Sequence, residues 1–159
     1  MIAKEFTICA GRGFALKYLP SFDKALLDAG VGNYNLVRLS SILPAHCKFV
    51  HASEITKYIQ EGSLLPTAYS TISSNKAGEE IVSTIGVGLS ENEDDVGVIM
   101  EFSATGMTLS SAFEILRSMI DEAFEVRGWT LKQVLSDGIS AIVPLDGTTT
   151  TTFACIAQW

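Results

Sequence analysis

Two adjacent serines, Ser40 and Ser41, end a strand-like run that begins at Asn35, and they lead into a turn before Pro44. A serine hydroxyl at such a place can attack the carbonyl carbon of the preceding residue and convert that peptide bond into an ester. β-Elimination would then cut the chain and leave Ser41 as a dehydroalanine, which hydrolyses to a pyruvoyl group. A ketone of this kind does work that other enzymes leave to a separate cofactor. Adjacent serines more often mark only a turn, so the prediction depends on the residues around them.

A second candidate for chemistry is Glu101, which is the only charged residue between Val96 and Phe102. A carboxylate in an apolar strand is costly to bury unless it is paired or protonated. Two interpretations are open. Glu101 forms an ion pair at an interface, or burial keeps its carboxyl group protonated and able to donate the proton.

A short helix is predicted over Phe22–Ala29, with Ser21 as its N-cap and Gly30 as its stop. This helix would place Asp23 in its first turn, where a carboxylate can simply favour the helix dipole. Leu26 belongs to the apolar stripe of the helix and could be an ordinary core residue.

The remaining pattern contains strands and two further helices. A second short helix is expected over 53–60, and strands are expected over 64–73, 81–89, 96–102, 134–143 and 148–159. The only long helix starts at a capping box of Ser111 and Glu114, ends at Arg127–Gly128, and carries an apolar stripe of Phe113, Leu116, Ile120 and Phe124. Together these elements predict an α+β fold in which helices cover antiparallel β-layers.

Composition narrows the class of protein. The chain has 159 residues, of which 47% are hydrophobic and 18% charged, so we expect one domain with a large core and enough apolar surface to favour an oligomer. A net charge of −7 argues against a nucleic-acid partner. No apolar stretch reaches membrane-spanning length and no signal peptide is recognisable, so we expect no membrane partner and a cytoplasmic location. Cys9, Cys47 and Cys155 are read as free thiols, and His46 and His51 as surface or loop residues.

Taken together, the segments around the serines resemble the pyruvoyl-dependent arginine decarboxylases. The resemblance is carried by Asn-Leu-Val-Arg-Leu-Ser-Ser-Ile-Leu-Pro, which ends at Pro44, and by Met-Glu-Phe around Glu101. Its segments are residues 22–44, 66–69, 77–79, 97–101, 124–129 and 153–157, so the resemblance is spread along nearly the whole length of the chain.

The resemblance implies cleavage between Ser40 and Ser41, giving a β chain of residues 1–40 and an α chain of residues 41–159 that begins with the pyruvoyl group. It also implies a β-sandwich flanked by helices (αββα layers) in a single domain, assembled as homotrimers with active sites between subunits. Asn35 would support the cleavage. In a straight strand it would lie about 20 Å from Ser41, so it must act through a bend or from another subunit.

The resemblance further implies that L-arginine is the substrate and that agmatine and CO2 are the products. Asp23 would bind the guanidinium group, Leu26 would pack along the methylene chain, and Glu101 would return a proton to the α-carbon. No metal is expected. Two alternatives stay open: decarboxylation of histidine or lysine by the same machinery, and an uncleaved, non-catalytic subunit that only assembles with partners.

Overall fold

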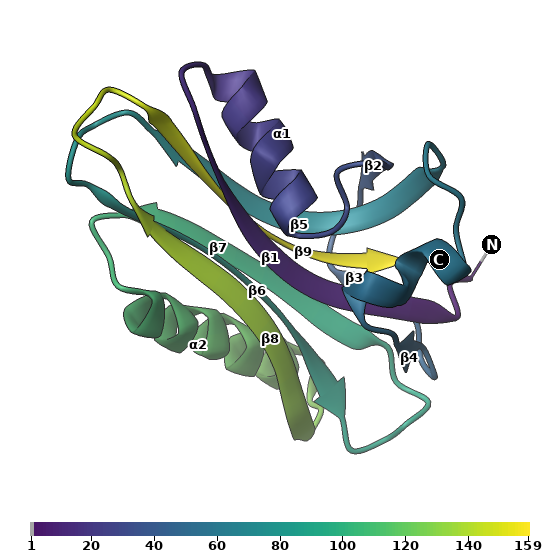
Figure 1. Cartoon of the computed structure of the whole chain (residues 1–159). Coiled ribbons are helices and arrows are strands. Elements are labelled where there is room, and N and C mark those ends of the chain that lie inside the picture. Colours follow the sequence, from purple (N-terminus) through teal and green to yellow (C-terminus); the bar gives the residue numbers. More distant parts are fainter. Residues whose placement is uncertain (1) are drawn as a thin grey trace.

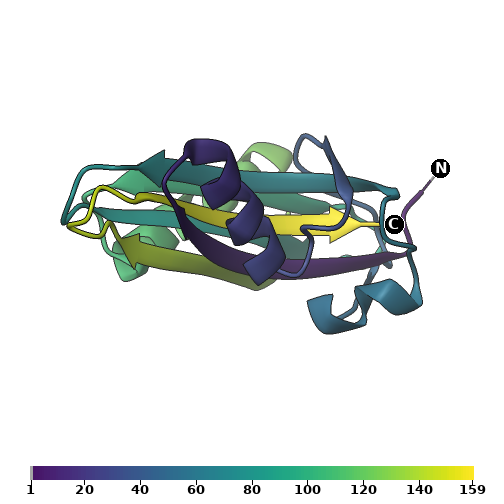
Figure 2. The same cartoon turned by 45° about the horizontal axis from the view of Figure 1, so that its top comes forward.

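The computed structural model describes residues 2–159 and arranges them in four layers, as Figures 1 and 2 show. α1 (Tyr18–Asp28) covers the outer face of a five-stranded sheet, and α2 (Leu109–Arg127) covers the outer face of a four-stranded sheet. The inner faces of the two sheets pack against each other. The predicted α+β fold, with helices flanking a β-sandwich, is confirmed.

The five-stranded sheet has the order β2-β5-β9-β1-β4, and its strands are β1 (Glu5–Ala15), β2 (Asn35–Arg38), β4 (Lys48–Phe49), β5 (Leu64–Ser74) and β9 (Thr149–Gln158). The four-stranded sheet has the order β3-β7-β6-β8, and its strands are β3 (Ile42–Leu43), β6 (Glu80–Ser90), β7 (Gly97–Thr105) and β8 (Leu131–Ile142). Most neighbouring strands are antiparallel, but β1 with β4 and β2 with β5 run parallel. The expected antiparallel pairing is therefore correct only in part.

Apolar side chains fill the space between the layers. Between the sheets lie Phe6, Leu43, Ala68, Ile85, Val87, Ile99, Ala154 and Ile156. Between α1 and the five-stranded sheet lie Leu26 and Ala25 of the helix against Phe153 and Cys155 of β9. Under α2 the predicted stripe packs on Val98 of β7, and Leu116, Ile120 and Phe124 are its buried members. The stripe read from the sequence is thus the face that the helix buries.

The ends of α2 were predicted with one error. Gly128 ends the helix with a φ of 66°, a left-handed conformation that glycine adopts readily. At the other end Thr108, not Ser111, is the N-cap, and its side chain accepts a hydrogen bond from the Ser111 amide at 3.3 Å. Ser111 lies three residues after the cap, where it supplies the amide rather than the acceptor.

The first helix begins earlier than predicted. Lys17 is its N-cap, without a side-chain hydrogen bond, and the helix starts at Tyr18. Ser21 is buried inside the helix, where its hydroxyl donates to the Tyr18 carbonyl at 2.7 Å and lies 2.7 Å from the Thr151 hydroxyl. Asp23 is therefore in the second turn rather than the first.

Two further differences concern short or unexpected elements. The second helix is a single 3₁₀ segment, η1 (Ala52–Lys57), shorter than the predicted 53–60. Strand β1 was not predicted at all, although it pairs along its length with β9. Cys9 of β1 faces Cys155 of β9 with their Sγ atoms 3.4 Å apart, and the two buried thiols are free, as is Cys47.

Candidate active site

The Ser40-Ser41 bond lies where the chain crosses from one sheet to the other. β2 is an edge strand of the five-stranded sheet and β3 an edge strand of the four-stranded sheet. On one side of the bond the Leu39 amide donates to the Thr67 carbonyl at 3.0 Å, and on the other the Ile99 amide donates to the Ser41 carbonyl at 2.8 Å. Ser40 is exposed and Ser41 half-buried. The bond itself is thus accessible, while its two flanks are held by different sheets.

Glu101 lies on β7, two residues beyond the Ile99 amide that holds Ser41. Its Oε1 atom accepts a hydrogen bond from Nη2 of Arg38 at 2.6 Å, and the two side chains form an ion pair. The Glu101 side chain keeps 35% of its surface exposed. Within one chain, the Glu101 carboxylate is thus partly exposed and paired with Arg38.

Arg38 is a site residue that the sequence reasoning missed. Its guanidinium carbon lies 4.6 Å from the centre of the Tyr69 ring, and its Nη2 atom also donates to the Tyr69 carbonyl at 3.3 Å. The charge of Glu101 raises the pKa of the Arg38 guanidinium above its ordinary value. A signal was present in the sequence, since Arg38 is the only charged residue between Asn35 and Leu43.

Asn35 lies at the start of β2. Its side-chain amide donates to the Gly62 carbonyl at 2.7 Å, and its backbone amide donates to the Ser63 carbonyl at 2.9 Å. These bonds fix the beginning of β2 beside β5. Within residues 2–159 no hydrogen bond joins Asn35 to Ser41.

Asp23 and Leu26 lie on α1, which covers the outer face of the five-stranded sheet (Figure 1). Asp23 is exposed, whereas Leu26 is 9% exposed and packs in the cluster under the helix. Among the described residues no hydrogen bond or ion pair joins Asp23 to Ser41 or Glu101. One chain therefore brings Ser40, Ser41 and Glu101 together, but not the two residues expected to bind the substrate.

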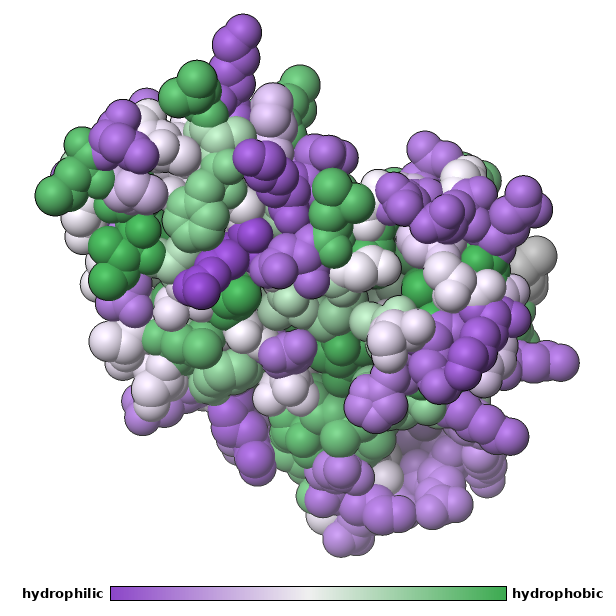
Figure 3. Space-filling view, in the orientation of Figure 1, coloured by the Kyte–Doolittle hydropathy of each residue, from purple (hydrophilic) through white to green (hydrophobic). Residues whose placement is uncertain are grey.

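An apolar groove of about 540 Å³ opens beside the crossing. Leu39 and Ile42, the residues on either side of the two serines, line it together with Pro44, Pro66, Val96 and Trp159. Figure 3 shows that apolar side chains are exposed on other parts of the surface too. Large apolar side chains more than half exposed include Leu16, Leu19, Leu64, Val126, Ile142 and Leu145.

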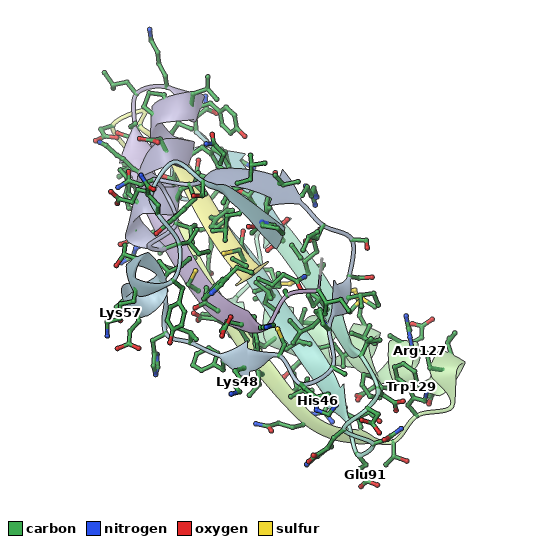
Figure 4. The ribbon with its side chains drawn as sticks, turned by 90° about the vertical axis from the view of Figure 1, so that its right-hand side faces the viewer. His46, Lys48, Lys57, Glu91, Arg127 and Trp129 are labelled. Carbon is green, nitrogen blue, oxygen red and sulfur yellow. The ribbon has the colours of Figure 1, made fainter. Side chains whose placement is uncertain are left out.

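The histidines lie outside this site, as expected. His46 and His51 are exposed, and His46 Nε2 lies 3.0 Å from a carboxylate oxygen of Asp94. Figure 4 shows His46 at the same end of the molecule as Glu91, and Glu91 belongs to the loop between β6 and β7. Within residues 2–159 no cluster of three or more potential metal ligands exists, and no helix is long and apolar enough to cross a membrane.

Comparison with known proteins gives one consistent result. Residues 5–156 match the family described as pyruvoyl-dependent arginine decarboxylase. A protein of that name from Pyrococcus abyssi is 47% identical over 116 residues, which are 73% of this chain and 71% of that protein. Another of that name, from Methanococcus aeolicus, is 35% identical over 153 residues, which are 96% of this chain and 88% of that protein. The matched range includes Asp23, Ser41 and Glu101.

Proposed function

Because this chain belongs to the pyruvoyl-dependent arginine decarboxylase family, we propose that it cuts itself between Ser40 and Ser41 and then converts L-arginine to agmatine and CO2. The family makes the chain a lyase with a covalently bound pyruvoyl group. The observation that carries the proposal is the position of the two serines at an exposed sheet crossing, with Glu101 on the strand that holds Ser41.

The residues at the crossing fit the formation of a pyruvoyl group. The Ser41 hydroxyl would attack the Ser40 carbonyl carbon, so that the C–N bond between the residues breaks and an ester forms. Elimination would then remove the α-proton of residue 41, break its Oγ–Cβ bond and leave the Ser40 carbonyl as a carboxylate. Water would replace the nitrogen on residue 41 with oxygen and release it as ammonia. The pyruvoyl ketone supplies the electron-withdrawing group that decarboxylation of an amino acid needs.

Two features of the chain suit the steps that follow. The Ser41 carbonyl is held by the Ile99 amide, so residue 41 would keep its place on β7 after the cut. Glu101 lies two positions along the same strand and would return a proton to the substrate α-carbon once CO2 has left.

The substrate-binding residues point to an assembly. Asp23 is exposed on the outer face of α1, without a hydrogen bond or ion pair to Ser41 within the described part of the chain. We therefore assign Asp23 to the site of a neighbouring subunit in a homotrimer, where its carboxylate would bind the substrate guanidinium in a bidentate pair. Leu26 is core within one chain and would contact the substrate only through its exposed edge. Asn35 would support cleavage by fixing the start of β2.

The test begins with a denaturing gel of the purified protein, run with reductant because Cys9 would lie in one product and Cys155 in the other, 3.4 Å away. We expect two bands, and mass spectrometry of the larger product should show a pyruvoyl end at residue 41. Purified protein is then given arginine, lysine, histidine and citrulline, and CO2 release is measured. A single full-length band would refute the proposal in favour of a non-catalytic subunit. Faster turnover of lysine or histidine would refute the arginine assignment alone.

A further inference from the structure

The Arg38–Glu101 ion pair spans the proposed cleavage site. Arg38 is the last residue of β2 in one sheet, and Glu101 lies on β7 in the other. After a cut between Ser40 and Ser41, Arg38 would belong to the short product and Glu101 to the long one. The 2.6 Å contact would then join two separate chains.

The pairing conflicts with the role proposed for Glu101. The Glu101 carboxylate oxygen that accepts the hydrogen bond from Arg38 at 2.6 Å is held by that guanidinium. A proton donor must carry a proton, and it must also be free to approach the substrate α-carbon. The contact seen in the intact chain therefore suits a precursor, and the active enzyme needs Arg38 to be neutralised by another group.

Cleavage would create such a group close to Arg38. The new end of the short chain is the α-carboxylate of Ser40, two residues along the chain, or about 7 Å in an extended strand. Ser40 is exposed and lies beyond Leu39, whose amide makes the final bond between this segment and β5. Because the terminus is tethered, its carboxylate competes for the guanidinium at a high effective concentration.

We propose that Arg38 is a positioning residue that exchanges partners, holding Glu101 in the intact chain and the terminal carboxylate of Ser40 after the cut. The inference rests on the proposed function, since it requires cleavage at Ser40-Ser41. Tyr69 supports the guanidinium in both states through its ring and its carbonyl oxygen. Glu101 is thereby kept in place during folding and released for the substrate only when residue 41 has matured.

The exchange can be followed by NMR of the arginine side chains, because a guanidinium held in an ion pair rotates slowly and its Nη protons exchange slowly. Four proteins are compared: intact Ser41→Ala and cleaved wild type, each with and without Glu101→Gln. We expect Glu101→Gln to remove the slow Arg38 signal from the intact protein and to leave it in the cleaved one. Loss of the signal in both forms, or in neither, would overturn the exchange.

A matched control lies on α2, where Arg117 donates to Asp121 at 3.0 Å with side chains 58% and 50% exposed. Its signal should be the same in all four proteins and should disappear only in Asp121→Asn. Crystal structures of Ser41→Ala and of the cleaved wild type give a second measurement, which does not depend on how much Glu101→Gln protein is cut. A guanidinium bound to Glu101 in both structures would also overturn the exchange.

The two proposals can fail separately. A cleaved wild type that forms agmatine but keeps Arg38 on Glu101 would leave the proposed function intact and remove only the exchange. A wild type that is never cut forms no Ser40 carboxylate and would remove both.

Discussion

The strand β6 and the Ser40-Ser41 crossing belong to the same sandwich but are built in opposite ways. β6 has 11 residues, pairs with β7 on one side and β8 on the other, and is buried along nearly its whole length. The crossing joins β2, with 4 residues, to β3, with 2 residues, and each is an edge strand. β6 contributes core contacts, whereas a cut at the exposed crossing would remove none.

The difference explains why chemistry at the crossing is compatible with a stable fold. Local stability follows the number of buried contacts and protected hydrogen bonds, and both are few at the crossing. Cleavage there would free a chain end at the surface, because Ser40 is already exposed. The same event in β6 would open the interior of the four-stranded sheet.

The largest expected effect is that of Ser41→Ala, which removes the attacking hydroxyl. Cleavage and agmatine formation should both disappear, while the far-UV circular dichroism spectrum stays that of the wild type. A reducing gel measures cleavage, and a CO2 assay measures turnover. Ser118→Ala removes an exposed hydroxyl on α2 that donates to the Ile115 carbonyl, and it should cleave normally. Two product chains from Ser41→Ala would place the cut elsewhere.

Glu101→Gln should lower agmatine formation by about 10²- to 10⁴-fold in the fraction that is cut, because an amide is a poor proton donor. Turnover is normalised to the pyruvoyl content found by mass spectrometry. Glu114→Gln, an exposed glutamate on α2, serves as the control and should keep wild-type turnover. Wild-type turnover in cleaved Glu101→Gln protein would remove Glu101 from the reaction.

Asp23→Asn should cleave normally but lose about 2–5 kcal/mol of transition-state stabilisation for arginine, measured as a lower kcat/KM, since one partner of a desolvated charge pair is lost. Citrulline, which lacks the guanidinium charge, should be affected much less. Steady-state kinetics with both substrates in both proteins gives the comparison. Equal losses for the two substrates would show that Asp23 does not read the guanidinium.

Gly88→Ala tests the opposite region. A Cβ at this position would lie 2.6 Å from atoms of both Ile120 and Phe124, so we expect unfolding to require about 1–3 kcal/mol less free energy. The measurement is urea unfolding in the Ser41→Ala background, where the chain stays in one piece. Gly86→Ala, whose Cβ would lie 3.2 Å from Leu116, should cost less. When Ser41 is kept, neither Gly88→Ala nor Gly86→Ala should alter cleavage. Impaired cleavage in Gly88→Ala would show that β6 and the crossing are coupled.

The smallest effect concerns Cys47, in the loop after the crossing. Burial raises the pKa of the Cys47 thiol to about 11, so its reaction with a thiol reagent should be slow at pH 7 and accelerate toward pH 11. Because the folded form holds this proton more tightly than an unfolded thiol, the associated stability is present below pH 9 and is lost as the pH rises toward 11. Cys47→Ala should abolish the labelling. Fast labelling at pH 7 would mean that the loop opens more readily than its packing indicates.

Sequence reasoning worked best where one local pattern decides the structure. The strands β5 and β9 and the stripe of α2 were predicted closely, because alternation and helical spacing reflect which face is buried. The left-handed end at Gly128 has a local cause as well.

The errors arose where distant contacts override local signals. Ser21 has the appearance of an N-cap, but its hydroxyl lies against Thr151 of β9, so the helix starts earlier. β1 contains Gly11 and Gly13, and glycine is depleted in strands, so the local pattern does not indicate one. A Cβ on Gly11 would lie 2.4 Å from the Ala25 carbonyl oxygen, so these glycines let α1 approach the strand.

For the candidate site, the sequence indicates individual residues but not the contacts between them. Ser41 and Glu101 follow from residue type and from the resemblance, but the Arg38–Glu101 contact depends on how two sheets meet, which no local pattern encodes. The exposed position of Asp23 on the far face of α1 could not be read from the sequence either, since it depends on which side of the helix packs on the sheet.

The place of β1 has a consequence for the reversibility of folding. The short product would contain β1, which lies between β9 and β4 in the interior of a sheet. It would therefore stay with the long product as long as the sheet exists. Once unfolded, however, the two chains would have to meet by diffusion, so recovery would depend on protein concentration, whereas the uncut precursor folds as a single molecule. The chain would therefore have to fold before it is cut. The cut protein would persist because it unfolds slowly, not because it refolds readily.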